Sequence, residues 1–132
     1  MASILKVDTI TGVTTAGSIA ITGEGNSTTT NLQQGLAKSW IKYNGTGTIA
    51  ISDSFNVASI TDETTGTTTV TFTGAMGNAN YSIKGQNSDG SLHLQVVDTN
   101  QTSSAYRQRT LDGSAQLADD SAVYGDIHGD LA

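Results

Sequence analysis

Apolar side chains at every second position limit the fold of this chain more than any other feature of its sequence. In the segment TTTVTFT, residues 67 to 73, Thr68, Val70 and Phe72 share one side and the remaining threonines share the other. A repeat of two residues is typical of a β-strand with one buried face. A longer stretch at residues 40 to 62, WIKYNGTGTIAISDSFNVASITD, also alternates. These patterns predict antiparallel strands around a core that includes Val70 and Phe72.

A hairpin turn is predicted inside the longer stretch. Asn44 and Gly45 form the Asn-Gly pair, which is the strongest short-range signal for a β-hairpin. We expect this pair to join a strand at residues 40 to 43 to a returning strand at residues 48 to 52.

Two large side chains of this stretch are expected to anchor the core. Trp40 is the one tryptophan of the chain, and Phe55 is one of two phenylalanines. Because large aromatic side chains contribute most to core burial, we expect both to be buried. Phe55, Val57 and Ser59 are expected to share one face of the next strand.

Short strands continue to the end of the sequence. The chain is rich in threonine, which suits a pleated surface, and has 15 glycines and no proline. About seven strands at intervals of roughly 8 to 12 residues predict an all-β domain over residues 36 to 132, an antiparallel β-sandwich or a partly closed barrel. We expect the last, weaker strand at residues 122 to 125, followed by a polar end.

Residues 1 to 35 are predicted to be an extended N-terminal arm. Its apolar residues come as isolated pairs among Thr and Gly, Leu5 with Val7 and Ile19 with Ile21. We expect two short strands at most. Such a segment buries too little apolar area to offset its ordering entropy, so it either hangs free or is ordered by a partner.

Composition limits the class of function. The net charge is −6, with six Lys and Arg residues in all, which argues against binding to nucleic acid. There is no cysteine, so disulfides and thiolate metal sites are excluded. We find neither a signal peptide nor an apolar run long enough to span a bilayer, so we expect synthesis in a cytoplasm without membrane insertion.

The usual catalytic motifs are missing from the sequence. There is no phosphate-binding Gly-Lys-Thr loop, no Gly-x-Ser-x-Gly elbow and no His-Glu-x-x-His pair, and the chain has two histidines in all. We therefore expect no enzymatic activity and no cofactor.

Weak candidates for cation ligands lie near the C-terminal end. Asp126, His128 and Asp130 alternate along the chain and can converge on one ion from an extended segment. A solvated polar tail is the favoured interpretation, since nothing nearby fixes the geometry.

Two other groups are weaker candidates for ion sites. His93 with Gln95 can line a threefold axis in an oligomer, although a surface pair is the plainer interpretation. Asp53, Asp62 and Glu63 lie near strand ends, but their spacing matches no known calcium loop.

Candidate ligand contacts come from a predicted strand at residues 105 to 111. Arg107 and Arg109 share a face there, opposite Tyr106, Gln108 and Thr110. They can recognise a carboxylate ligand, although pairing with acidic neighbours is more ordinary. Aromatic residues can also form a sugar-stacking platform, although the core is expected to need most of them. The residues considered for this platform are Trp40, Tyr43, Phe55 and Tyr81.

The middle of the chain is similar to known phage proteins. Residues 37 to 83, AKSWIKYNGTGTIAISDSFNVASITDETTGTTTVTFTGAMGNANYSI, resemble the repeating theme of small structural proteins and tail-fibre modules of tailed bacteriophages, especially marine and cyanobacterial ones. The opening MASILKVDTITG and the segment SAVYGD, residues 121 to 126, also look like the two ends of such proteins. Gly77 stands where the family usually has proline.

The resemblance implies a β-rich, trimeric virion protein without catalysis. It implies a short tail appendage or fibre component, docked to other virion proteins through residues 1 to 35 and displaying its β-domain toward a host surface glycan. A capsid decoration or head-fibre protein is the close alternative. A free carbohydrate-binding module or a depolymerase fragment is a further alternative from a different class.

Overall fold

The computed structural model describes residues 5–12, 19–22, 28–88 and 93–130. The chain divides into two units, Met1–Leu36 and Ala37–Ala132. The division falls one residue from the boundary expected between arm and domain. The protein is nearly all β, as expected. The described residues contain ten strands, two in the first unit and eight in the second, where about seven were expected.

The first unit contains a small hairpin and one helical turn. Strand β1 (Ala20–Thr22) pairs antiparallel with β2 (Thr29–Asn31), and α1 (Leu32–Gly35) follows directly. The Leu32 amide donates a hydrogen bond to the Ile19 carbonyl at 2.8 Å. The exposed large apolar side chains among the described residues of this unit are Leu5, Val7, Ile10, Ile21 and Leu36, and Leu5 retains 80% of its accessible surface. The described residues of the arm therefore contribute nothing to an apolar core.

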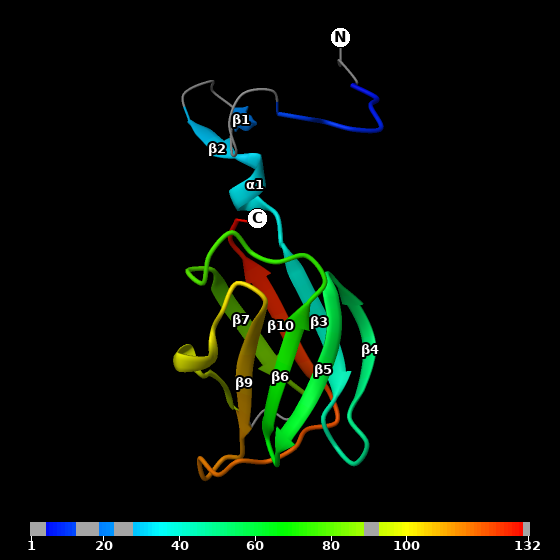
Figure 1. The fold of residues 1–132 in the computed structure, drawn as a ribbon, viewed down its shortest axis with the longest axis vertical. Helices are drawn as coiled ribbons and strands as arrows, with labels where there is room; N and C mark the ends of the chain where they lie inside the picture. The colour runs from blue at the N-terminus through cyan, green and yellow to red at the C-terminus, as the bar shows by residue number, and fades with distance from the viewer. Residues whose placement is uncertain (1–4, 13–18, 23–27, 89–92, 131–132) are drawn as a thin grey trace. The chain divides into compact units, whose positions relative to one another are not determined.

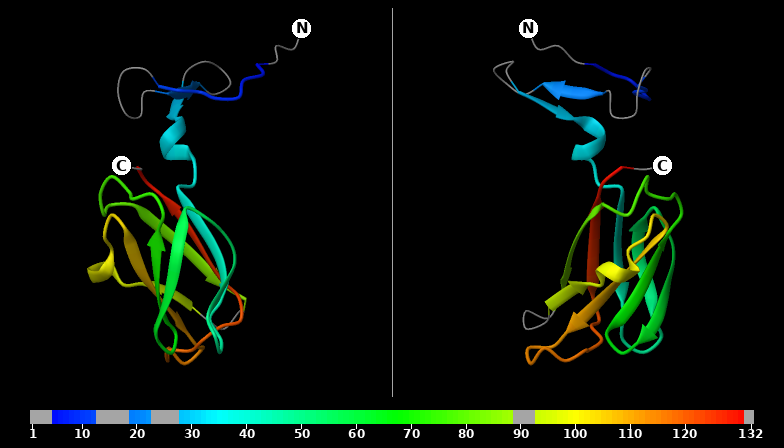
Figure 2. Two further views of the ribbon diagram at one scale, coloured as in Figure 1. Left: turned by 45° about the vertical axis from the view of Figure 1, so that its right-hand side comes forward. Right: turned by 60° about the vertical axis from the view of Figure 1, so that its left-hand side comes forward.

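The second unit is a sandwich of two four-stranded antiparallel sheets, which Figure 1 shows face on and Figure 2 shows from two further sides. We call them sheet I and sheet II. Sheet I has the order β4-β3-β10-β7, with bounds β3 (Ser39–Asn44), β4 (Ala50–Phe55), β7 (Ser82–Asn87) and β10 (Val123–His128). Sheet II has the order β5-β6-β9-β8, with bounds β5 (Val57–Thr64), β6 (Thr67–Phe72), β8 (His93–Val96) and β9 (Ala105–Leu111). A short 3-10 helix, η1 (Asp98–Asn100), follows β8.

The core lies between the two sheets. Val70 and Phe72 are buried in it, and the ring of Phe72 meets that of Tyr81 edge to face at 5.6 Å. The buried apolar side chains are Ile41, Tyr43, Val70, Phe72, Met76, Tyr81, Tyr106, Val123 and Ile127.

Trp40 and Phe55 do not anchor this core, contrary to expectation. Trp40 is 39% exposed and Phe55 is 50% exposed. Strand β3 turns Ser39, Ile41 and Tyr43 inward, so the parity of the strand places Trp40 on the outer face. Strand β3 buries its aromatic Tyr43 instead.

The chain crosses from sheet I to sheet II at Asn56, so the strand expected through Phe55, Val57 and Ser59 is interrupted. Asn56 has a φ of 56°. Its Nδ2 donates to the carbonyls of Lys38 at 3.0 Å and Gly74 at 3.1 Å, and its Oδ1 accepts from the Gly74 amide at 2.7 Å. These bonds hold the corner between β4 and β5.

The hairpin expected at Asn44-Gly45 is present, but its turn is longer than two residues. Residues 45–49 connect β3 to β4, and the left-handed φ of 63° falls at Gly47. Asn44 Oδ1 accepts hydrogen bonds from the Thr46 amide at 2.9 Å and the Thr46 hydroxyl at 2.8 Å. The Gly45 amide donates to the Asp120 carbonyl at 2.8 Å, which ties the loop to the segment before β10.

The last strand is a central strand and runs further than expected. β10 lies between β3 and β7 and continues to His128, so Asp126 and His128 belong to a strand and not to a solvated tail. Its inward positions are Val123, Gly125 and Ile127. A Cβ on Gly125 would lie 2.6 Å from the Tyr106 hydroxyl, so any other residue there would have to displace the buried Tyr106 side chain.

Candidate functional site

An exposed aromatic surface covers the outer side of sheet I. Burial alternates along β3 and β10, so the residues between the buried ones point to solvent. Trp40 and Tyr124 retain 39% and 40% of their accessible surface. Most aromatic residues of this chain are buried, so two exposed aromatic rings on one outer face are unusual.

The strand register sets the neighbours on this surface, which we call the aromatic face. Cross-strand pairs place its side chains in two rows across the four strands. The first row is Phe55, Trp40, Asp126 and Lys84, and the second is Asp53, Lys42, Tyr124 and Gln86.

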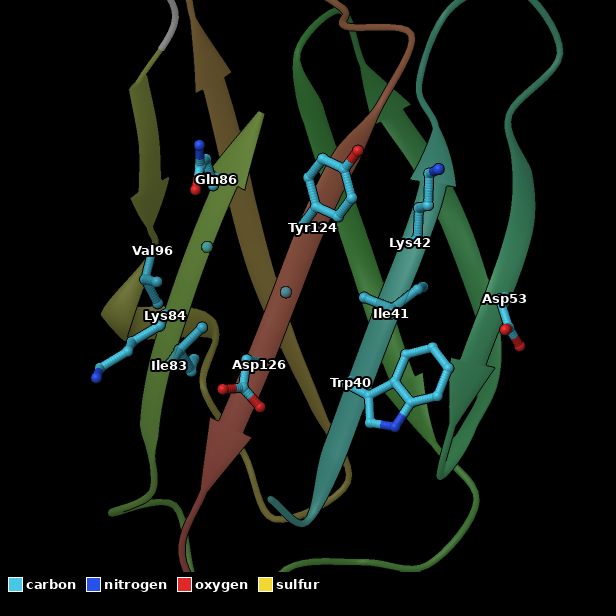
Figure 3. A pocket seen from close by; sticks show the side chains of 12 residues that line it. Trp40, Ile41, Lys42, Asp53, Ile83, Lys84, Gln86, Val96, Tyr124 and Asp126 are labelled. Atoms are coloured by element: carbon cyan, nitrogen blue, oxygen red, sulfur yellow. The ribbon is translucent and has the colours of Figure 1, made fainter. Parts of the chain in front are cut away.

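An open groove of about 880 Å³ lies over the aromatic face. Figure 3 shows the rings of Trp40 and Tyr124 above β3 and β10, with polar side chains around them. The outward-pointing residues that line the groove are Trp40, Lys42, Asp53, Lys84, Gln86, Tyr124 and Asp126, and Ile41, Ile83, Gly85, Val96 and Gly125 complete the lining.

Two polar contacts organise the groove. Lys42 Nζ lies 5.6 Å from the centroid of the Tyr124 ring, within range of a cation–π interaction. His128 Nε2 lies 3.2 Å from Asp126 Oδ2, which restrains the carboxylate beside Trp40. The groove thus combines flat apolar rings with oriented donors and acceptors, which is the chemistry of a binding surface.

The predicted arginine pair lies on the other sheet, away from the aromatic face. Arg107 Nη2 forms an ion pair with Glu63 Oε1 at 3.0 Å, and its Nε donates to Thr69 Oγ1 at 3.2 Å. A hydrogen bond from Thr69, followed by the charge of Arg107, lowers the pKa of Glu63 below its usual value. Arg107 therefore pairs with an acidic neighbour, which is the plainer of the two interpretations. Arg109 shares this outer face, and its buried Nε has no hydrogen-bond partner among the described residues.

Tyr81 belongs to the core, as the plainer interpretation expected, and does not lie on an exposed surface. Its side chain is 6% exposed, and its hydroxyl lies 2.8 Å from the Thr102 carbonyl and 3.0 Å from the Ala105 carbonyl. Burial raises the pKa of Tyr81 to about 12. Tyr43 is also buried, with its hydroxyl accepting from Gln108 Nε2 at 2.6 Å. Of the four residues considered for a sugar platform, Trp40 and Phe55 therefore remain exposed.

The predicted cation ligands do not form a cluster in the part of the chain that the structure describes, where no three His, Asp or Glu side chains gather to hold an ion. Asp126 and His128 contact one another. Asp53 lies in sheet I, whereas Asp62 and Glu63 lie in sheet II.

The hypothesis that His93 and Gln95 line a threefold axis concerns strand β8. Gln95 is exposed there, and the side chain of His93 lies outside what the structure describes. Over the described ranges, no helix has both the length and the apolar composition to cross a membrane.

Tyr124 is the site residue that sequence reasoning missed. The segment SAVYGD predicts a weak closing strand and, by itself, assigns no role to its tyrosine. The missed signal is the pattern Val123, Gly125, Ile127, in which glycine replaces one apolar residue of an inward-facing row.

Comparisons of the chain with protein-family models, with curated proteins and with solved structures returned no match.

Proposed function

We propose that this chain is a non-catalytic structural protein of a bacteriophage virion, a short tail appendage or fibre component attached through residues 1 to 35. The observation that carries the proposal is the division into a sandwich with its own core and an arm in which several of the described apolar side chains are exposed. Exposed Leu5, Val7 and Ile10 favour docking, because a partner that covers them removes apolar surface from water. The resemblance of residues 37 to 83 to phage fibre modules supplies the biological setting.

A capsid decoration or head-fibre protein is the alternative within the same proposal. It keeps the arm as the docking element and changes only the virion surface that receives it. Copy number per particle separates the two positions. Quantitative mass spectrometry of purified particles should find a handful to a few dozen copies for a tail component, and hundreds for a capsid protein. Absence from purified particles would contradict both.

We also propose a homotrimer. Only 36% of the residues are apolar, so shared burial between subunits would add to a thin core. Sedimentation equilibrium of the full chain should give three times the monomer mass of 13.6 kDa. A monomer at high protein concentration would contradict the trimer but would not affect the proposal that residues 1 to 35 dock the chain.

A carbohydrate-binding module is the second candidate function. The exposed rings of Trp40 and Tyr124 over one groove favour it, because aromatic faces on an open sheet suit stacking with sugars. It is compatible with a place on a virion, where the sandwich would contact a glycan on the host surface.

A further inference from the structure

We propose that the aromatic face binds a neutral oligosaccharide, with Trp40 and Tyr124 packing flat against its sugar rings. The inference deepens the proposed function by naming what the displayed sandwich contacts, while the site itself consists entirely of sandwich residues.

The two rings are placed as a stacking platform. Tyr124 lies two residues along β10 from Asp126, which pairs with Trp40, so the two rings are diagonal neighbours. Diagonal neighbours in an antiparallel sheet are about 7–8 Å apart, which is within reach of aromatic side chains, so one ligand can contact both rings. In Figure 3 both rings are seen nearly face on from the open side of the groove. A sugar ring presents C–H bonds on its faces, and these pack against the negative face of an aromatic ring.

Hydrogen-bonding groups surround the platform on both sides. The carboxylates of Asp53 and Asp126 accept, the ammonium groups of Lys42 and Lys84 donate, and the amide of Gln86 does both. Sugar hydroxyls also both donate and accept, so a ring seated on the platform meets partners of each kind. Lys42, which lies over Tyr124 in the free chain, has a flexible stem that lets its ammonium group move to a hydroxyl.

The charges of the groove favour an uncharged ligand. Two lysines and two aspartates line it, so its formal charge is zero, whereas the whole chain carries −6. A polyanion would gain no net attraction from the groove and would be repelled by the rest of the chain. A neutral polymer rich in hydroxyls complements this surface.

The same charges disfavour a second copy of the chain as the occupant. In the rows of the aromatic face, charged side chains stand directly beside the rings. A protein partner pressed against Trp40 and Tyr124 would also cover Lys42 and Asp126, and would need a matched partner for each. An oligosaccharide brings those partners as hydroxyls.

The experiment uses the single tryptophan as a reporter that already lies in the site. The full chain would be titrated with a panel of neutral oligosaccharides of glucose, galactose and mannose, and Trp40 fluorescence would be recorded. We expect a saturable change with at least one sugar. In the Tyr124→Ala variant, which keeps the reporter, the affinity for that sugar should fall about tenfold. Leu117→Ala is the matched control, because Leu117 is a similarly exposed apolar side chain, 42% accessible, and does not line the groove.

Three outcomes would overturn the proposal. The first is the absence of a saturable fluorescence change with every sugar of the panel. The second is an equal affinity of the unmodified chain and of Tyr124→Ala for the sugar. The third is a fluorescence change that follows protein concentration, which would assign the face to self-association. Circular dichroism of each variant checks its fold. Incorporation of Tyr124→Ala into particles tests the proposed function separately. A variant that loses sugar binding but is incorporated normally would leave the virion role unaffected and would concern only the glycan site.

Discussion

Gly66 occupies the two-residue turn between β5 and β6 under two separate constraints. Its φ is 64°, in the left-handed region that favours glycine, and an added Cβ would lie 2.6 Å from the Thr110 carbonyl oxygen and 2.6 Å from the Ala118 amide nitrogen. Its own amide donates to Asp119 Oδ1 at 2.5 Å. Gly47 has nearly the same φ, 63°, but a Cβ added there would meet nothing within 4 Å.

These two glycines allow strain and crowding to be separated. Gly47→Ala should lower the free energy of unfolding by about 1–2 kcal/mol through the backbone conformation alone. Gly66→Ala should lower it by about 2–5 kcal/mol, because the backbone collision adds to the same strain. Urea denaturation of both variants measures the difference. Equal losses would mean that the packing around Gly66 yields to a methyl group.

Tyr81 makes the stability of the sandwich sensitive to alkaline pH. Burial raises its pKa from the ordinary 10.0 to about 12, so between these values the folded chain keeps a proton that the unfolded chain loses. Its stabilising contribution is therefore complete below pH 10 and disappears as the pH rises to about 12. Burial raises the pKa of Tyr106 in the same direction.

We expect the free energy of unfolding to fall as the pH rises through this range. Tyr81→Phe, which has no proton to lose, should be less stable at neutral pH and should show a shallower fall above pH 10. Urea denaturation at a series of pH values gives the slope for each chain. An unchanged slope in Tyr81→Phe would contradict the assignment.

At the level of elements, the corner between β4 and β5 depends on one side chain. Asn56 makes three hydrogen bonds to the backbone of Lys38 and Gly74 and adopts a φ of 56°. Asn56→Ala should lower the free energy of unfolding by about 2–4 kcal/mol, because all three bonds are lost. Asn56→Gly should cost about 1 kcal/mol less, since glycine accepts this φ without strain. If both variants denature at the wild-type urea concentration, the corner is held by other contacts.

Strands β6 and β9 are elements whose inward faces were predicted correctly from the sequence. In β6 and β9 every second residue is large or β-branched, and the expected inward faces are buried. Those residues are Thr68, Val70 and Phe72 in β6 and Tyr106, Gln108 and Thr110 in β9. Thr67, expected on the outer face of β6, is also buried. Elsewhere in these two strands the alternation holds, so a single strand contains enough information to assign its faces.

The expectations failed where a local pattern had two solutions. In β3, Trp40 competes with Ile41 and Tyr43 for the inward face, and the side-chain period of two allows only one set. In β10, Gly125 occupies an inward position because the Tyr106 hydroxyl fills the space, so the apolar row looks broken in the sequence. Both errors concealed the aromatic face, because recognising it requires the cross-strand register of β3 and β10.

At the scale of the whole molecule, the two units should behave independently. Among the described residues, the buried apolar side chains of the core all come from the second unit. A chain of residues 36 to 132 should therefore unfold at the same urea concentration as the full chain and with the same cooperativity. A lower midpoint would mean that residues 1 to 35 contribute to the stability of the sandwich.

The central claim is that residues 1 to 35 attach a folded sandwich to a virion. The most direct measurement compares incorporation of the full chain, of residues 36 to 132 and of the Tyr124→Ala variant into phage particles, by mass spectrometry of the purified particles. We expect the full chain and Tyr124→Ala to be incorporated normally, and we expect the truncated chain of residues 36 to 132 to be absent from particles although it is folded. Normal incorporation of residues 36 to 132 would contradict it.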